Sequence, residues 1–275
     1  MKNIIFVPSV EESNWVQEIL PGTSPAELPI AGKRYIDYAL EYAGKCGYEM
    51  AEILDWHFSP KLGADFSKLT DYTIPVFYQQ GSGEMPTSVK DLSKQSSPLT
   101  QSLSAETTVV WGLRLPNFEI RNVADWHKAN LDILNGESYF GTHFTLPGYS
   151  AEGGVYLGRN VVMENGCEAQ KPVLLQDNAW CARNVRLDGF CIIGKNAFIS
   201  EGAHLERTVI GDDTYVGIGL ELVDKIVIGP RIINVNTGTW TVIEDSTMVS
   251  RIDNEMGFFD KIMEFIRGKA RRRQP

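Results

Sequence analysis

The chain has 275 residues, of which 43% are hydrophobic and 22% charged, and its formal net charge is −9. This composition is typical of a globular protein with room for two domains. We expect no transmembrane helix, because no run approaches about 18 apolar residues. The apolar run at the start is too short for a signal peptide, which predicts a cytoplasmic protein. The acidic balance argues against nucleic acid as a partner.

Residues 1–135 have the alternating pattern of an α/β domain. The segment Ile4–Val7 is a candidate buried strand, and Tyr35–Tyr42 is a candidate amphipathic helix that Gly44 and Gly47 end. The further strands expected in this half are Tyr48–Trp56, Thr73–Gln79 and Val109–Trp111. Between the last two, residues 81–106 are rich in Ser, Gln and Thr, which predicts a surface excursion.

The second half carries a six-residue repeat. One series of apolar residues is Leu157, Met163, Ala169, Leu175, Cys181, Leu187, Ile193, Ile199 and Leu205. A second series, four residues after each, is Val161, Cys167, Val173, Ala179, Val185, Cys191, Ala197, Ala203 and Val209. A helix would space apolar residues three and four apart, and one strand would alternate them only briefly. The six-residue period predicts a parallel β-helix of stacked coils.

The repeat extends beyond residue 209 with one deletion. The first series continues with Ile210, Val216, Leu222 and Ile228, and the second with Thr214, Leu220, Ile226 and Ile232. It breaks at Asn234–Trp240 and resumes at Ile243. We therefore predict a β-helical domain over residues 136–255. Three cysteines, Cys167, Cys181 and Cys191, lie in its inward positions, where we expect free thiols that act as small apolar groups.

Residues 256–275 form a basic tail. Its six apolar residues at helical spacing are Phe258, Phe259, Ile262, Met263, Phe265 and Ile266, and its net charge from Phe258 onward is +4. Two uses fit this pattern. A helix could cap the last coil, because an uncapped β-helix exposes apolar interior and strand edges. Alternatively, Phe258–Arg273 could contact an anionic membrane surface, which would make the protein membrane-peripheral.

Two segments resemble the sugar-nucleotide pyrophosphorylases, a family of nucleotidyltransferases. The stretch Leu28–Leu40 (LPIAGKRYIDYAL) is similar to the family's "LPI.GKP.I.Y.L" segment, and Asp125–Leu131 (DWHKANL) to its "W.dll.aN" helix. The resemblance implies a reduced Rossmann-like nucleotidyltransferase-type domain followed by a left-handed β-helix. It also implies a role in NDP-sugar or cell-envelope polysaccharide metabolism, a sugar nucleotide or sugar phosphate as ligand, and a trimer. Lys33 and Arg34 are the candidate substrate-binding residues in the first segment.

The sequence departs from this family at its signature loop. The family places glycines and a basic residue after its first strand, where backbone amides bind the nucleotide phosphates. Here Val7–Trp15 has no glycine and contains Glu11 and Glu12. Residues 1–135 also lack a Gly-Asp pair that could hold Mg²⁺, and we find no metal motif or identifiable cofactor. We therefore predict a degenerate pyrophosphorylase site that does not condense an NTP with a sugar phosphate; any enzyme activity would be that of a transferase.

The β-helix offers two further candidate sites. His204 follows the inward Ala203 and should point outward, either as a solvated surface residue or as the general base of an acyltransferase. The segment Ile232–Asp245 is similar to the acetyl-acceptor loop of bifunctional uridylyl/acetyltransferases. Its candidate substrate-binding residues are Asn234, Asn236, Gly238 and Trp240. Valine and asparagine replace the loop's tyrosine and aspartate, so the loop could instead only close a coil.

A non-enzymatic role is the alternative to catalysis. Such a protein would be an oligomeric scaffold, or a regulator that binds a sugar nucleotide. We expect self-association through outward apolar residues of the coils, which include Tyr156, Trp180 and Phe198.

Overall fold

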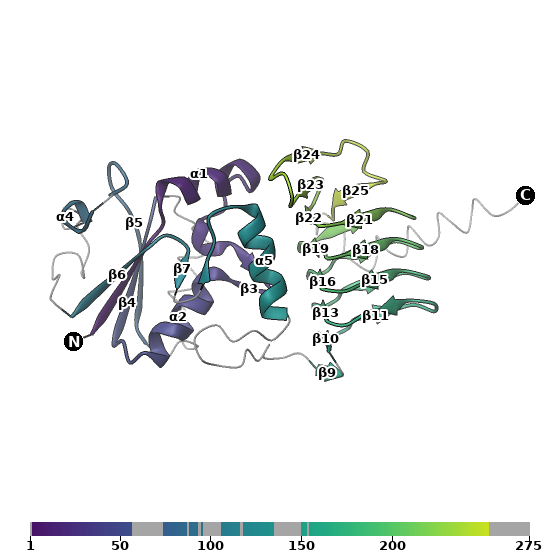
Figure 1. Ribbon diagram of the computed structural model, residues 1–275, viewed down its shortest axis with the longest axis horizontal. Coiled ribbons are helices and arrows are strands. Elements are labelled where there is room, and N and C mark those ends of the chain that lie inside the picture. Colours follow the sequence, from purple (N-terminus) through teal and green to yellow (C-terminus); the bar gives the residue numbers. More distant parts are fainter. Residues whose placement is uncertain are drawn as a thin grey trace, which may run out of the picture. The chain divides into compact units, whose positions relative to one another are not determined.

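The computed structural model describes residues 2–56, 74–86, 88–92, 95, 106–115, 118–134, 150–152 and 154–252. The chain divides into two compact units, one built mainly from Met1–Ala129 and the other mainly from Thr145–Pro275 (Figure 1). The sequence-based boundaries at residues 135 and 255 stay predictions. No helix in the described ranges is long and apolar enough to cross a membrane. The tail, residues 256–275, lies outside the described part.

The first unit contains a parallel sheet in the order β5-β4-β1-β6. Its strands are β1 (Asn3–Val7), β4 (Met50–Asp55), β5 (Val76–Gln80) and β6 (Thr107–Trp111). The two central strands, β1 and β4, are almost entirely buried, as expected for a parallel sheet covered on both faces. The α/β class and the four strands predicted for this half are confirmed.

Five helical segments and two short hairpins complete the first unit's described elements. They are α1 (Val10–Ile19), η1 (Pro25–Glu27), α2 (Tyr35–Lys45), α4 (Val89–Leu92) and α5 (Val123–Leu134), with β2 (Pro29–Ile30) paired to β3 (Lys33–Arg34) and β7 (Arg114–Leu115) to β8 (Phe118–Glu119). Helix α2 runs through Gly44, which was predicted to end it, and stops at Lys45. Gly47 follows the cap residue Cys46 with a φ of +73°, and Tyr48 N donates to Ala43 O over 3.1 Å. Glycine adopts this left-handed backbone without strain, which explains why the helix stops there.

Helix α1 was not predicted, because Val7–Trp15 was interpreted as the counterpart of the family's signature loop. Its start carries a capping box, in which the Ser9 hydroxyl accepts from Glu12 N (3.2 Å) and the Glu12 carboxylate accepts from Ser9 N (3.1 Å). The pattern Ser-x-x-Glu before an apolar residue is the sequence signal for this cap. It places the side chain of Glu12 at the N-terminus of α1, immediately after β1.

The second unit consists of three strand-rich sheets that the chain visits in turn. Sheet I has the order β24-β23-β22-β19-β16-β13-β10-β9, sheet II β11-β14-β17-β20-β25 and sheet III β12-β15-β18-β21. Val155 pairs with Val173, and Val173 with Cys191, so successive coils are eighteen residues apart. Ile192 then pairs with Val209, which shortens that coil to seventeen residues. The parallel, strand-rich second half is as predicted. The seventeen-residue coil between Ile192 and Val209 accounts for the one-residue deletion in the repeat.

The strands of the three sheets are short. Sheet I contains β9 (Ser150–Glu152), β10 (Val155–Leu157), β13 (Val173–Leu175), β16 (Cys191–Ile193), β19 (Val209–Ile210), β22 (Lys225–Ile228), β23 (Arg231–Asn234) and β24 (Trp240–Val242). Sheet II contains β11 (Val162–Met163), β14 (Trp180–Cys181), β17 (Phe198–Ile199), β20 (Thr214–Val216) and β25 (Val249–Arg251). Sheet III contains β12 (Glu168–Ala169), β15 (Arg186–Asp188), β18 (His204–Glu206) and β21 (Glu221–Val223).

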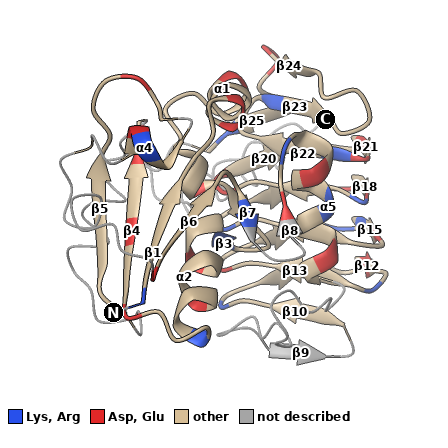
Figure 2. Cartoon of the chain, turned by 60° about the vertical axis from the view of Figure 1, so that its left-hand side comes forward, with Lys and Arg blue, Asp and Glu red and all other residues tan. Residues whose placement is uncertain are grey.

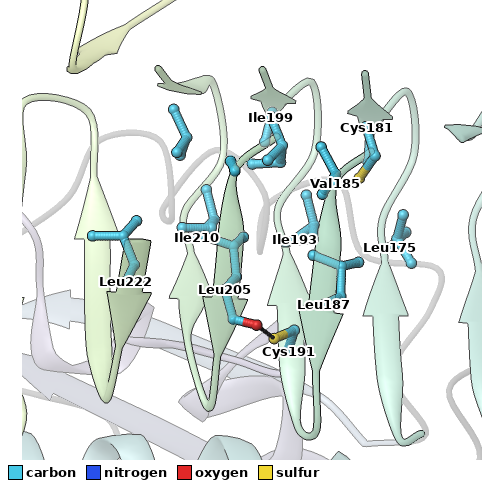
Figure 3. Packing of buried hydrophobic residues seen from close by; sticks show 14 of the residues in the cluster. Leu175, Cys181, Val185, Leu187, Cys191, Ile193, Ile199, Leu205, Ile210 and Leu222 are labelled. Carbon is cyan, nitrogen blue, oxygen red and sulfur yellow. Dashed lines mark hydrogen bonds between the residues drawn. The ribbon is translucent and has the colours of Figure 1, made fainter. Parts of the chain in front are cut away.

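The interior between the sheets is filled by columns of apolar side chains (Figure 3). Leu175, Ile193 and Ile210 form one column, and Leu187 and Leu205 belong to another, all at most 1% exposed. The prediction for Ile228 was wrong: Ile210 pairs with Val227, and Val227 enters this core while Ile228 is half-buried. A second seventeen-residue coil is the reason.

The cysteines of the coils are free and buried or half-buried, as predicted. Burial raises the pKa of Cys191 to about 12, and its Sγ lies 3.3 Å from Leu205 O (Figure 3). Burial raises the pKa of Cys181 as well. Thiols that stay protonated inside a core are poor nucleophiles, so these residues act as packing groups.

One corner of the coils carries a ladder of hydrogen-bonded asparagine and aspartate side chains. Asn160, Asn178, Asn196 and Asp213 all have φ between +51° and +60°. Each asparagine donates from Nδ2 to the next side chain, over 3.2, 2.9 and 2.9 Å. Asparagine tolerates the left-handed backbone better than most residues, and its side chain can bond upward and downward in the stack. The ladder therefore explains why this corner repeats asparagine.

Both ends of sheet I change strand direction. At one end β9 is antiparallel to β10. At the other, β23 is antiparallel to β22, and β24 to β23. The break predicted at Asn234–Trp240 is the turn between β23 and β24, so the segment forms a hairpin there.

Candidate functional site

The carboxyl ends of β1 and β6 meet at the point in the first unit's sheet where the strand order reverses. In open α/β sheets this is the place where ligands bind, and a helix N-terminus there attracts anions. Here α1 begins directly after β1, and Gly112 N donates to Val7 O over 2.7 Å to join the two strand ends. A phosphate-binding site of this kind would be expected at the start of α1.

The side chain of Glu12 fills that position. It is only 6% exposed, and its carboxylate accepts backbone hydrogen bonds from Ser9 and Leu113. Gly112 has a φ of +78°, which favours glycine, and a Cβ at this residue would lie 2.5 Å from Glu12 Oε1, so a larger residue would be strained and would displace the carboxyl group. Two backbone donors at this position, Ser9 N and Leu113 N, are therefore already bonded to the Glu12 carboxylate.

Burial is the main influence on the titration of this site. It raises the pKa of Glu12, while the hydrogen bonds from Ser9 and Leu113 and the charge of Arg114 lower it. Tyr35 is buried nearby and its hydroxyl bonds Arg114 O over 3.2 Å; burial first, and the charge of Glu12 second, raise the pKa of that phenol. Burial thus makes both the Glu12 carboxyl and the Tyr35 phenol harder to ionise than they would be in water.

A second polar cluster lies at the carboxyl end of β4. The carboxylate of Asp55 is fully buried and accepts hydrogen bonds from the hydroxyls of Ser24 and Tyr78, the latter over 3.1 Å. Sequence analysis did not identify these residues; the signal was an aspartate at the end of a buried strand. In the part of the chain that the structure describes, no group of three or more His, Cys, Asp or Glu side chains could hold a metal ion.

The predicted substrate-binding residues of the first unit form intramolecular ion pairs. Lys33 Nζ lies 2.5 Å from Glu41 Oε1, and the Arg34 guanidinium bonds Asp37 over 2.9 and 3.0 Å. Both partners lie on α2, so the pairs attach the β2–β3 hairpin to that helix. Substrate binding by Lys33 and Arg34 stays a prediction.

On sheet III, His204 has a carboxylate partner that sequence analysis could not identify. Its Nε2 lies 2.6 Å from Asp188 Oδ2, and its Nδ1 lies 3.6 Å from Glu221 Oε1. Arg186 Nη2 also contacts Asp188 Oδ2, over 2.9 Å. Asp188 Oδ1 is buried without a hydrogen-bond partner among the described residues. The side chain of His204 is 23% exposed, so the ring is partly accessible to solvent.

The outer side of sheet III carries many charged residues. Figure 2 shows blue and red segments along β12, β15, β18 and β21. Eighteen or seventeen residues separate equivalent positions, and this spacing brings His204 beside Arg186 and Glu221 in the pairing of adjacent strands. The coil period, which sequence analysis identified, could have predicted these neighbours. Of the other three histidines, His57 and His143 lie outside the described residues, and His127 is buried in α5.

The four candidate residues of the acceptor-like loop lie together in the β23–β24 hairpin. Asn234 N donates to Thr239 O (2.8 Å), and its side-chain oxygen accepts from Asn236 N (3.0 Å). Gly238 has a φ of +70° and closes the turn. Trp240 lies under the guanidinium of Arg231, 5.0 Å from the ring centroid. These contacts explain the residues as a hairpin, and their role in substrate binding stays a prediction.

The outward aromatic residues proposed for self-association differ in exposure. Tyr156 and Trp180 are half-buried, but Phe198 is only 6% exposed. It stacks between Trp180 and Tyr215, with ring centroids 6.2 and 6.0 Å away. Phe198 therefore offers little free surface, and the trimer stays a prediction.

Comparison with known proteins indicates a nucleotidyltransferase-like relationship. The chain is 30% identical over 112 residues to a UTP–glucose-1-phosphate uridylyltransferase of Synechocystis sp. (strain ATCC 27184 / PCC 6803 / Kazusa). The match covers 40% of this chain and 28% of that protein, so the chain spans well under half of its relative. No protein-family profile matches the chain.

Proposed function

We propose that this chain is a sugar-nucleotidyltransferase-like protein of NDP-sugar or cell-envelope polysaccharide metabolism whose pyrophosphorylase site is degenerate. The observation that carries the proposal is the side chain of Glu12, which occupies the anion-binding position at the start of α1. The similarity to a uridylyltransferase supports the ancestry, and the Glu12 geometry supports the loss of NTP condensation.

The chemistry of the position explains the loss. Condensation needs backbone amides and cations on the nucleotide phosphates as negative charge shifts during phosphoryl transfer. A carboxyl group held by two of those amides competes with the phosphate, and when it is ionised it also repels it. The protein would then keep a sugar nucleotide as a ligand without turnover, as a regulator or oligomeric scaffold of a pathway enzyme.

The second unit fits this proposal as a left-handed parallel β-helix. The three sheets and their coil spacing support a β-helix, and the handedness follows from the family resemblance alone. We also propose that the protein assembles as a trimer through faces of these coils. Light scattering at micromolar concentration should give three times the mass of the chain; a monomer would contradict the assembly.

A pyrophosphate-release assay with UTP and glucose 1-phosphate tests the proposed loss of condensation. We expect no release at ordinary enzyme rates, on the order of 1 s⁻¹ or more. Thermal unfolding with UDP-glucose should show a higher melting temperature, since a ligand of the native state stabilises it. Steady turnover by the wild-type chain would overturn the degenerate site, and the absence of any shift with UDP-glucose and related sugar nucleotides would overturn the ligand class.

Acyl transfer is a second candidate function, favoured by the contact between His204 and Asp188. If Nε2–H donates to the aspartate, Nδ1 is free to accept the proton of an acceptor hydroxyl or amine. The acceptor oxygen or nitrogen would bond the acyl carbon as its bond to the CoA sulfur breaks, and the thiol would leave protonated. Release of free CoA from acetyl-CoA, in the presence of a sugar nucleotide, measures this reaction. It should fall about 100-fold or more in His204→Gln; no release by the wild-type chain excludes the candidate.

A further inference from the structure

One edge of sheet I is formed by the exposed strand β24. In the described part of the chain, β24 pairs only with β23, so no strand lies along its other edge (Figure 1). Thr241 is exposed, and Val242 is 45% exposed. An unpaired strand edge is a template for another strand unless charges, proline or a cover protect it. The segment Thr239–Ile243 (TWTVI) contains neither a charge nor a proline, so its sequence does not protect this edge.

The backbone of β24 directs hydrogen-bonding groups to this edge at alternate residues. Thr239 O accepts a hydrogen bond from the last residue of β23 over 2.8 Å. Ile243 N donates to the residue just before β23, also over 2.8 Å. Because successive residues of an antiparallel strand point their backbone groups in opposite directions, Trp240 and Val242 direct theirs to the free edge. A second strand could therefore bond to these two residues.

The edge is complementary to a second copy of itself. In an antiparallel pair about a twofold axis at Thr241, Trp240 would lie opposite Val242 of the other copy, and the two Thr241 residues would face each other. Trp240 and Val242 would exchange backbone hydrogen bonds, and both kinds of cross-strand pair are favourable. The same register places the exposed Glu244 opposite Gly238, whereas in-register parallel pairing would place it opposite Glu244 of the other copy. Like charges directly opposite are destabilising, so the charges favour the antiparallel pair.

We propose that β24 is a docking surface for β24 of a second copy of this chain, which joins it edge to edge as an antiparallel strand. The contact lies at an edge of sheet I, whereas the trimer proposed above uses faces of the coils, so each can form without the other. One short strand from each chain takes part, and small interfaces are weak, so we expect pairing at about 0.1 mM protein rather than at micromolar concentration. This inference is independent of the proposed nucleotidyltransferase ancestry.

The substitution Thr241→Cys in the full chain tests this register. The two residues at position 241 would form a non-hydrogen-bonded pair with Cα atoms about 4.5 Å apart, which is within the range of a disulfide. Under mild oxidation, Thr241→Cys should form a product with the mass of two chains about tenfold faster than Thr239→Cys. Position 239 is the matched control, because it is exposed in the same hairpin but would lie opposite Ile243. Equal rates in the two variants, or a rate no higher than that of the wild-type chain, would overturn the proposal.

A second measurement does not depend on disulfide formation. Thr241→Lys would place two like charges opposite each other at the twofold axis, which opposes pairing. Light scattering of the wild-type chain and of the control Thr239→Lys should give about twice the mass at 0.1 mM that it gives at about 1 μM. Thr241→Lys should show no such increase. A doubling that persists in Thr241→Lys, or a wild-type mass that is the same at both concentrations, would contradict the proposed contact.

Discussion

The two units of this protein are stabilised by different kinds of contact. In the stacked coils, each position has an equivalent neighbour seventeen or eighteen residues away, so a side chain packs against copies of its own environment. In the first unit, Glu12 depends on partners from distant parts of the chain, such as Leu113. Repetition spreads the stabilisation over many similar contacts, whereas the α/β unit concentrates buried polar interactions at a few positions, such as Glu12 and Asp55. The comparison predicts that a substitution in the coils will also destabilise the neighbouring coils, whereas a substitution in the first unit will have a local effect.

Leu205→Ala should give the largest effect and the clearest separation of the two units. Leu205 is fully buried in the coil core, and its truncation should cost about 3 kcal/mol of unfolding free energy through lost burial and a cavity. Hydrogen exchange should accelerate in the neighbouring strands β15 and β21 but stay unchanged in β1. Leu205→Met is the control and should cost less than about 1.5 kcal/mol. Equal acceleration in both units would show that they unfold as one.

Asn178→Ala should have the next largest effect. Alanine at a φ of +60° is strained by about 1 kcal/mol, and two ladder hydrogen bonds are lost as well. Asn178→Gly accepts the backbone conformation and loses only the ladder, so chemical unfolding should show a smaller loss. If the glycine variant is destabilised as much as the alanine variant, backbone strain is not the reason for asparagine at this corner.

The pH dependence of the first unit should change in Glu12→Gln. Burial raises the pKa of Glu12 above its ordinary value of 4.5, so the folded unit binds the proton more tightly than the unfolded chain. The stability linked to this proton is fully present below the unfolded pKa and is lost as pH rises through the folded pKa. Glutamine keeps the size and an acceptor but does not titrate, so it should lack this loss.

The free energy of unfolding of wild type and Glu12→Gln should be measured from about pH 4, just below the ordinary pKa of glutamate, to about pH 8. Glu11→Gln is the matched control, because Glu11 is exposed on the same helical turn. A parallel pH profile for wild type and Glu12→Gln would contradict the raised pKa.

Asp224→Asn should have the smallest effect. Asp224 forms two hydrogen bonds to Arg207, over 2.7 and 2.9 Å, but the arginine side chain is 41% exposed. Exposed ion pairs contribute about 1 kcal/mol or less, and salt screens them. Asparagine keeps the left-handed backbone of this residue, where φ is +52°. The difference in unfolding free energy should shrink at high salt; an effect as large as that of Leu205→Ala would contradict the ranking.

The fold was predictable where the pattern repeats. The six-residue series placed Leu175, Ile193 and Leu205 in the core, since a regular period specifies both the strands and their neighbours. Prediction failed for Ile228, because a one-residue shortening of the coil leaves no local mark in an apolar run such as Lys225–Ile228.

The candidate sites were harder to predict. Glu12 was identified as incompatible with a triphosphate, but its burial and its bond to Leu113 depend on the packing of β1 beside β6. Asp188 was missed as the partner of His204 although it lies one coil earlier, because the period was applied only to inward positions. Asp55, Ser24 and Tyr78 come from three separate segments, and no local pattern links them.

The antiparallel strands at the two ends of sheet I affect whether molecules can stack end to end. A stack of parallel coils is in principle an open-ended polymer, because each terminal coil is a template for another of the same polarity. Strand β9 reverses that polarity at one end, whereas at the other end two successive reversals return the edge strand β24 to the direction of β22. A neighbouring molecule that stacked end to end with the same polarity would meet an antiparallel strand at β9, so parallel continuation of this sheet from one molecule to the next is opposed at that junction.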